Sequence, residues 1–219
     1  MGNGKPKTLN QTEHPTRIQY NKKMSLVGKQ FPNISIKAMD YMGDAFEINV
    51  LEKAKKEGKK VLLFWYPKDF TFVCPTEIHA FQERMDEFTK RDTIVIGASC
   101  DTPEVHFAWL NTPKDDGGIE GVEYPILADT TRKLSTELDI LNEEFVTYRA
   151  TYLIDTTGTV FYASVNEMSI GRNVDDFLRM IDAKIFNEEK GDVCPANWSE
   201  GNEGMSATRD GVADYLSKN

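Results

Sequence analysis

Cys74 lies where a predicted buried strand gives way to a predicted helix. Residues 61–66 form a short apolar and aromatic run that is typical of a buried strand. After the cysteine, Pro75 and a series of apolar side chains predict an amphipathic helix: Ile78, Phe81, Met85 and Phe88. The partial positive charge of a helix N-terminus favours a thiolate. Position alone leaves two interpretations open, because most cysteines are inert packing residues.

Two residues before Cys74 favour the nucleophilic interpretation. Thr71 places a hydroxyl within one helical turn of the thiol, and Pro67 places a ring without an N–H donor seven residues before it. This pattern on a strand-to-helix turn resembles the active-site motif of the peroxiredoxins. It is most similar to the typical two-cysteine, alkyl hydroperoxide reductase C-type branch. The similarity covers roughly residues 25–200 and includes residues 101–111, 148–151 and 192–198.

The resemblance implies a fold and an activity. The expected fold is α/β and thioredoxin-like, with a central mixed β-sheet flanked by helices and a C-terminal arm. The expected enzyme reduces hydrogen peroxide and organic hydroperoxides, together with peroxynitrite, and uses neither a cofactor nor a metal. Its expected role is antioxidant defence and cell redox homeostasis.

The resemblance also implies partners. In the family, the reactive cysteine becomes a sulfenic acid, which a cysteine of a partner subunit converts into an intersubunit disulfide. An external dithiol then reduces this disulfide, and both thioredoxin and a dedicated flavoprotein disulfide reductase stay open as that reductant. The family forms homodimers, commonly assembled into a ring of five dimers, a decamer.

The chemistry of a cysteine nucleophile needs supporting charges. A thiol with an ordinary pKa of about 8.5 is only a few per cent thiolate at neutral pH, so a cation or several donors must stabilise the anion. Arg149 is the candidate cation, and the resemblance implies that it faces the thiolate. Thr71 would donate to the thiolate or hold the peroxide oxygen, and Pro67 would shield the sulfur from water. Glu77, one helical turn after the cysteine, could orient Arg149.

A second arginine joins this set by resemblance. Arg172 matches an arginine that completes the Glu–Arg network of the family, although it could equally be a simple helix-start residue.

Cys194 and Cys100 compete for the role of the second thiol. Cys194, within residues 191–198, matches the resolving-cysteine motif of the family. Cys100 ends an apolar strand at a position where the family commonly carries valine, so it is interpreted as a packing residue. No motif links the three histidines, for which packing or surface roles are expected: His14, His79 and His106.

Two rival classes share some of these features. A thioredoxin-type disulfide oxidoreductase would have the same fold, but residues 74–77 lack the second cysteine of a C-x-x-C motif. An oligomeric chaperone that shields apolar surface is compatible with the family, but it does not explain Pro67, Thr71 and Arg149.

The composition argues against further classes. A net charge of −9 at pH 7 argues against nucleic acid as a partner. No apolar run approaches the roughly 20 residues that span a bilayer, and the polar N-terminus lacks the apolar core of a signal peptide. A cytoplasmic location is therefore expected. The three cysteines fit neither a disulfide framework nor a Cys/His metal cluster.

Buried strands alternate with helices along the chain, and a hairpin closes the pattern. Strands are expected at residues 33–38, 61–66, 93–100, 126–129, 150–155 and 159–165, and helices at 49–58, 75–88, 103–110, 131–138 and 173–186. This alternation predicts an α/β sandwich with a mixed sheet. The predicted parts are a flexible N-terminal arm (1–24), a thioredoxin-like peroxidase domain (25–186) and a C-terminal arm (187–219) that carries the resolving cysteine.

One further expectation concerns inactivation by excess peroxide. In family members that over-oxidise easily, a Gly-Gly-Leu-Gly loop and a C-terminal Tyr-Phe pair hold the active-site helix folded. This chain has Glu120 in place of the last glycine of the loop and Leu216 in place of the phenylalanine. A weaker clamp would let the disulfide form sooner, so the sequence predicts a comparatively robust enzyme.

Overall fold

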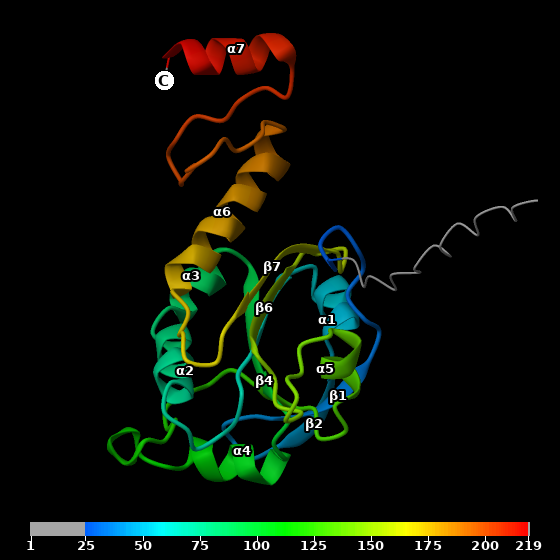
Figure 1. The fold of residues 1–219 in the computed structure, drawn as a ribbon, viewed down its shortest axis with the longest axis vertical. Helices are drawn as coiled ribbons and strands as arrows, with labels where there is room; N and C mark the ends of the chain where they lie inside the picture. Colours follow the sequence, from blue (N-terminus) through cyan, green and yellow to red (C-terminus); the bar gives the residue numbers. More distant parts are fainter. Residues whose placement is uncertain (1–24, 219) are drawn as a thin grey trace, which may run out of the picture.

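The computed structural model describes residues 25–218 and is built on a seven-stranded sheet (Figure 1). The predicted arm at residues 1–24, with His14, lies outside the described residues. The strands are β1 (Ser35–Met39), β2 (Ala45–Asn49), β3 (Lys60–Trp65), β4 (Thr93–Ser99), β5 (Ile126–Ala128), β6 (Arg149–Ile154) and β7 (Val160–Asn166), in the order β2-β1-β5-β4-β3-β6-β7. Strand β4 runs parallel to β3 and β5, and the other pairs are antiparallel. The predicted mixed sheet is confirmed.

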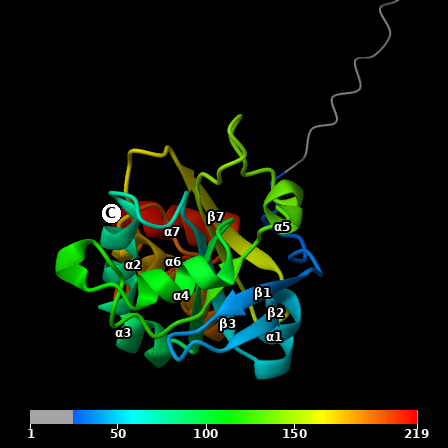
Figure 2. The same ribbon diagram turned by 90° about the horizontal axis from the view of Figure 1, so that it is seen from below.

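Helices cover both faces of this sheet. They are α1 (Val50–Glu57), α2 (Cys74–Gln82), α3 (Met85–Lys90), α4 (Pro103–Leu110), α5 (Lys133–Glu137), α6 (Val174–Lys190) and α7 (Arg209–Lys218). Helices α1 and α5 pack on one face, and α2, α3, α4 and α6 pack on the other (Figure 2). Among residues 25–218, no helix combines the length and apolarity that crossing a bilayer requires.

The core on the α2 face is aromatic. Phe81 of α2 stacks on Phe64 of β3 with ring centroids 4.1 Å apart, and Phe177 of α6 lies 5.8 Å from Phe81. Such contacts add to the burial of apolar area, which is the main favourable term in folding. The packing fixes α2, and hence Cys74, against the centre of the sheet.

The helix expected after Cys74 is two helices, so this prediction was wrong in its length. Helix α2 ends at Gln82, and Arg84 leaves the helical region with φ −108° and ψ 9°. The side chain of Arg84 instead pairs with Asp175 of α6 at 3.1 Å. Helix α3 then starts in a new direction and buries Phe88 in the core. Apolar spacing continued across the break, which is why the sequence did not reveal it.

Strand β2 was not predicted. Its first three residues are exposed, so it shows no alternation of buried and exposed side chains. It forms because β1 offers a free edge, with Ser35 opposite Asn49 and Met39 opposite Ala45. Pairing with a neighbour, rather than its own pattern, therefore defines this strand.

The C-terminal arm is more ordered than the sequence suggests. Helix α6 runs past the predicted boundary at Phe186 to Lys190 and ends at Gly191, which takes the left-handed conformation with φ 74°. The chain then folds back along α6, and Trp198 packs on Phe186 with centroids 5.0 Å apart. Helix α7 follows at the far end of α6, away from α2 (Figure 1).

Candidate active site

The strand register brings Cys74 and Arg149 together at the carboxyl end of β3, in the middle of the sheet. Cys74 is the first residue of α2 and is 1% exposed. Strand β6 runs antiparallel to β3 with Thr151 opposite Phe64, so Arg149, the first residue of β6, lies beyond the carboxyl end of β3. The loop that leaves β3 at this end leads directly to Cys74. Residues 75 positions apart in the sequence therefore meet.

A buried polar cluster holds the loop before Cys74. The Asp69 carboxylate accepts a hydrogen bond from Tyr66 Oη at 2.7 Å and lies 2.7 Å from His106 Nδ1, and the Asp69 backbone N–H donates to Asp101. Nε2 of His106 donates to the carbonyl of Leu127, since a carbonyl can only accept. Burial, followed by the Asp69 carboxylate, raises the pKa of Tyr66 well above its ordinary value. The loop is thus tied to α4 and to β5.

The same loop carries a strained residue. Phe70 has φ 53°, a left-handed conformation that bulky side chains rarely adopt. Its ring packs on Trp109 of α4 with centroids 5.7 Å apart. Because Asp69 is fixed on one side and α2 begins shortly after, the loop has little freedom to relax. The turn that presents Thr71 is therefore rigid.

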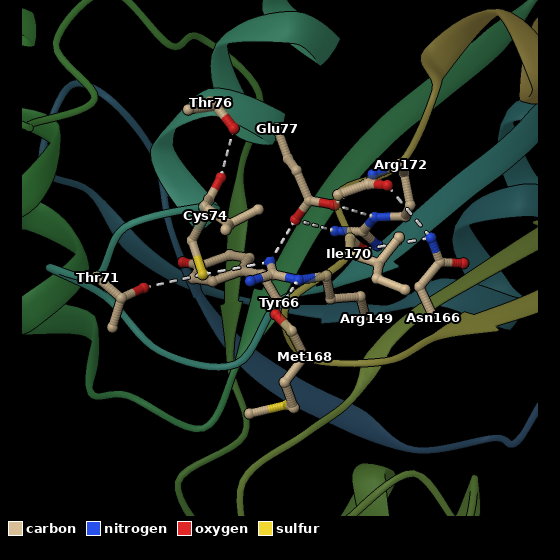
Figure 3. A network of polar contacts seen from close by, with 12 residues as sticks. Tyr66, Thr71, Cys74, Thr76, Glu77, Arg149, Asn166, Met168, Ile170 and Arg172 are labelled. Carbon is tan, nitrogen blue, oxygen red and sulfur yellow. Dashed lines mark hydrogen bonds and ion pairs between the residues drawn. The ribbon is translucent and has the colours of Figure 1, made fainter.

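Thr71 contacts the sulfur directly. Its Oγ1 lies 3.0 Å from Cys74 Sγ (Figure 3). The same oxygen lies 2.8 Å from the carbonyl oxygen of Lys68. A hydroxyl has one hydrogen to donate. With a neutral thiol, the hydroxyl can accept from S–H and donate to the carbonyl; with a thiolate, it can turn its hydrogen to the sulfur. The geometry serves both protonation states.

Glu77 is the hub of the charged network. Its carboxylate is buried and accepts from Arg149 Nη1 at 2.6 Å, from Arg172 Nε at 2.8 Å, from Arg172 Nη2 at 2.9 Å and from the Arg172 backbone N–H at 2.9 Å. Charge-assisted bonds of this kind are the strongest in proteins. One carboxylate on α2 therefore holds both guanidinium groups in place.

Arg149 spans the sulfur and the carboxylate. Its Nη1 lies 3.5 Å from Cys74 Sγ while it also donates to Glu77, and its Nε donates to the carbonyl of Met168 at 2.8 Å (Figure 3). The residue is 3% exposed, so little water screens its charge. The guanidinium can stabilise an anion at the sulfur.

Arg172 closes the network from the loop before α6. Its Nη1 donates to the carbonyl of Ala150 and to Thr151 Oγ1, both at 3.1 Å. Its guanidinium carbon lies 5.2 Å from the ring centroid of Phe64 and 5.8 Å from that of Phe81. Such cation–π contacts favour a buried guanidinium. Arg172 is therefore a buried partner of Glu77, which is the network role that the resemblance implied.

The charges of this network do not sum to zero. Arg149 and Arg172 carry two positive charges, and Glu77 carries one negative charge. The buried set is left with a charge of +1 until a further anion joins it. A thiolate at Cys74 would supply that anion at the sulfur that Arg149 already faces. The arrangement can therefore stabilise a nucleophilic thiolate next to a hydroxyl donor.

The structure does not bring every predicted site residue together. Pro67 is buried where the chain leaves β3. Cys194 lies on the C-terminal arm, where its Sγ donates to the carbonyl of Ala183 of α6 at 3.5 Å, and partial burial raises the pKa of its thiol. Cys100 lies 3.7 Å from Ser135, and burial raises the pKa of its thiol as well. Neither thiol lies beside Cys74 within the chain.

The sequence did not reveal the polar cluster around Asp69. His106 was expected to pack or to lie at the surface, and it is fully buried. His79, given the same expectation, is half-buried on α2. Asp69 and His106 stand in segments that carry the family resemblance, but nothing in their spacing shows that they meet. Their contact arises because α4, which carries His106, packs on β1 and β5 next to the loop that carries Asp69.

The chain matches known proteins over most of its length. The model of the AhpC/TSA family matches residues 27–163, and that of the C-terminal domain of 1-Cys peroxiredoxin matches residues 186–218. Alkyl hydroperoxide reductase C of Helicobacter pylori is 47% identical over 195 residues, which are 89% of this chain and 98% of the relative.

Solved structures agree with this assignment. The reduced 2-Cys peroxiredoxin of Plasmodium vivax superposes with a TM-score of 0.85 at 41% identity, over 88% of this chain and 99% of that one. Thioredoxin peroxidase I of Plasmodium yoelii gives a TM-score of 0.71 at 38% identity, over 80% and 99%. These matches confirm the predicted thioredoxin-like fold. The chain belongs to the AhpC/TSA family, as a thiol-dependent peroxidase of the two-cysteine peroxiredoxin class that reduces peroxides.

Proposed function

We propose that Cys74 is the residue that attacks the peroxide. The observation that carries this assignment is the placement of Arg149 and Thr71 at 3.5 Å and 3.0 Å from its sulfur. The thiolate attacks one peroxide oxygen and the O–O bond breaks. The sulfur becomes a sulfenic acid, and the other oxygen takes a proton and leaves as an alcohol, or as water when the substrate is hydrogen peroxide.

The surrounding residues have separate roles in this step. Arg149 stabilises the thiolate and the charge that develops on the leaving oxygen, and Thr71 donates to either group. Glu77 orients Arg149, with Arg172 as its second partner. Pro67 keeps water from the sulfur at the end of β3. Organic hydroperoxides and peroxynitrite share the O–O bond and are accepted as substrates.

Cys194 of a partner subunit resolves the sulfenic acid. Within one chain Cys194 lies on the arm, against Ala183 of α6, whereas Cys74 is the buried first residue of α2. The partner's thiol attacks the sulfenic sulfur, forms the intersubunit disulfide and releases water. Partial burial against α6 raises the pKa of the resting Cys194 thiol, which disfavours its thiolate form.

The sheet edge supports a homodimer. Strand β7 is an edge strand, and residues 28–31 bond to it at Val160. Phe161–Asn166 leaves backbone groups open to a second strand, and an antiparallel copy of β7 would satisfy them about a two-fold axis. Such a dimer would carry each C-terminal arm towards the neighbouring subunit.

Exposed aromatic side chains support the ring of dimers. Phe72 is 94% exposed, and Phe70 and Phe107 are also exposed over the loop before Cys74 and over α4. Apolar patches of this kind mark interaction sites. Contact between these patches would join five dimers into a decamer and would brace the active-site loop.

An external dithiol completes the cycle. A thioredoxin or a dedicated flavoprotein disulfide reductase would reduce the intersubunit disulfide, and the name of the Plasmodium yoelii relative, thioredoxin peroxidase I, supports thioredoxin. A thiol cycle of this kind runs in a reducing compartment, which supports a cytoplasmic location. Turnover with each reductant in separate assays distinguishes the two.

The assignment of the cysteines is tested by substitution. Cys74→Ser should abolish peroxide turnover, Cys100→Ser should retain most of it, and the oxidised parent should run as a dimer on a non-reducing denaturing gel. Cys194→Ser should lose that dimer band while its first turnover with peroxide proceeds. Substantial turnover by Cys74→Ser would refute the assignment, and a monomeric oxidised parent would place the second thiol within one chain.

Glu77→Gln should slow the attack on peroxide at least tenfold. The change removes the counter-charge of two buried guanidinium groups, a loss of about 3 kcal/mol or more in the free energy of unfolding when a buried pair is broken. Stopped-flow tryptophan fluorescence measures the rate, and urea denaturation measures the stability. Glu83→Gln, at the exposed end of the same helix, is the control and should match the parent. Parent-like attack by Glu77→Gln would show that the carboxylate does not orient Arg149.

Phe107→Glu should reduce the ring to dimers. A charge in the aromatic patch of α4 opposes its burial against another dimer, whereas the β7 edge is untouched. Light scattering coupled to size exclusion gives the mass. Phe145→Glu changes an exposed phenylalanine outside this patch and should leave the mass as in the parent. A full-size Phe107→Glu particle would place the contact between dimers on another surface.

A further inference from the structure

Asp69 and His106 form a buried pair that lies outside the charged network of Glu77. The two side chains are 1% and 0% exposed, and Nδ1 of His106 lies 2.7 Å from Asp69 Oδ2. Burial of such a pair costs free energy unless its polar atoms are hydrogen-bonded. Asp69 stands in the loop that leads from β3 to Cys74, and His106 stands in α4. The pair therefore joins the active-site loop to α4.

The hydrogen bonds of His106 fix the protonation of this pair. Nε2 lies 3.2 Å from the carbonyl oxygen of Leu127 and carries a hydrogen, because a carbonyl only accepts. In a neutral imidazole Nδ1 would then be an acceptor, and the carboxylate of Asp69 is an acceptor as well. A contact of 2.7 Å needs a hydrogen between the two atoms, on Nδ1 or on Oδ2. The pair therefore shares one hydrogen and has no net charge, either as imidazolium with carboxylate or as imidazole with carboxylic acid.

Asp69 is held by its side chain and by its backbone. Tyr66 Oη donates to Asp69 Oδ1 at 2.7 Å. Burial, followed by the Asp69 carboxylate, raises the pKa of Tyr66 well above its ordinary value, so the hydroxyl keeps its hydrogen. The Asp69 N–H donates to Asp101 Oδ2 at 2.9 Å, and that oxygen also accepts from Ser99 Oγ at 2.8 Å. Groups at the ends of β3 and β4, together with α4, thus fix one residue of the loop.

The residues on both sides of Asp69 set the position of the Thr71 hydroxyl. Lys68, directly before Asp69, supplies the carbonyl oxygen that lies 2.8 Å from Thr71 Oγ1. Phe70, directly after Asp69, has φ 53°, and Thr71 follows with its Oγ1 3.0 Å from Cys74 Sγ. A shift of Asp69 would therefore move both the hydroxyl and its carbonyl partner relative to the sulfur. Misplacement by about 1 Å at a reacting centre slows a reaction by as much as about 100-fold.

We infer that Asp69 and His106 are positioning residues for the attack on peroxide, and that they act through Thr71. This inference rests on the proposed roles of Cys74 and Thr71. Because the pair has no net charge, its contribution is the placement of the hydroxyl and not an electric field at the sulfur. A side chain at position 69 that forms the same hydrogen bonds without a charge should therefore serve equally well.

Asp69→Asn, His106→Leu and Tyr66→Phe test the inference. In Asp69→Asn, Oδ1 accepts from Tyr66 and Nδ2 donates to Nδ1 of a neutral imidazole, so attack should stay within about twofold of the parent. His106→Leu removes the link to α4 and should slow attack at least about tenfold. Tyr66→Phe removes one hydrogen bond to Asp69 at nearly constant shape and should slow attack about threefold. Stopped-flow tryptophan fluorescence in a single turnover gives each rate.

The same changes in a Thr71→Val background separate positioning from packing. There His106→Leu and Tyr66→Phe should each slow attack by less than about 1.5-fold, because the hydroxyl that the pair positions is absent. Damage to packing alone would slow both backgrounds by equal factors, and that result would overturn the inference. Urea denaturation shows which variants are folded, and Tyr66→Phe completes the comparison if His106→Leu is not.

Tyr152→Phe is the matched control for Tyr66→Phe. Tyr152 is a buried tyrosine in the core on the other face of the sheet, so its variant should keep the parent's rate. Attack in Asp69→Asn that is slower than in Tyr66→Phe would overturn the inference, because the charge of the pair would then matter. Parent-like attack in both His106→Leu and Tyr66→Phe would overturn it too. Substantial peroxide attack in Cys74→Ser would instead refute the proposed function.

Discussion

The buried charge of Glu77 is the constraint on which the site depends. Two guanidinium groups, from β6 and from the loop before α6, meet one carboxylate on α2. Buried charges are tolerated when they are paired and hydrogen-bonded, and this set retains one uncompensated positive charge. The sulfur of Cys74 lies 3.5 Å from Arg149, where an anion relieves the imbalance. The same arrangement that makes the fold accept two buried arginines thus favours a thiolate.

The fold places these groups by simple rules. Antiparallel pairing of β6 with β3 brings Arg149, at the start of β6, beside the carboxyl end of β3. Strand β7 pairs with β6 and ends opposite Arg149, so the loop that follows β7 brings Arg172 to the same place. Aromatic packing of Phe81 on Phe64 presses α2 onto the sheet. On the other side of the helix, Tyr124 and His79 bind it to a rigid loop. Helix α2 is thus held by the ion pairs of Glu77 and by the hydrogen bonds to Tyr124 and Gly118.

Much of this could be predicted from the sequence, because the signals are local. A short stretch contains the apolar run before Cys74, the strand-to-helix turn and the proline after the cysteine. Residues 148–151, around Arg149, resemble a motif of the peroxiredoxins. The break at Arg84 could not be seen, since apolar spacing continues across it and no proline or glycine marks the point where α2 ends. The contact of Asp69 with His106 and the link from Tyr124 to α2 were hidden for a similar reason. Each contact joins segments that are far apart in the sequence through one hydrogen bond, and such a bond produces no periodic pattern of residues.

The measurement that tests this account most directly is the rate of the first peroxide attack on Arg149→Gln. Each tenfold in rate corresponds to about 1.4 kcal/mol, and removal of a buried cation beside the sulfur should cost about 3 kcal/mol or more. Stopped-flow fluorescence under single-turnover conditions should therefore show attack slowed at least 100-fold. Arg179→Gln, an arginine of α6 that donates to the carbonyl of Trp198, is the control and should react as the parent does. A rate for Arg149→Gln within threefold of the parent would contradict the account, because the charge at the sulfur would then come from elsewhere.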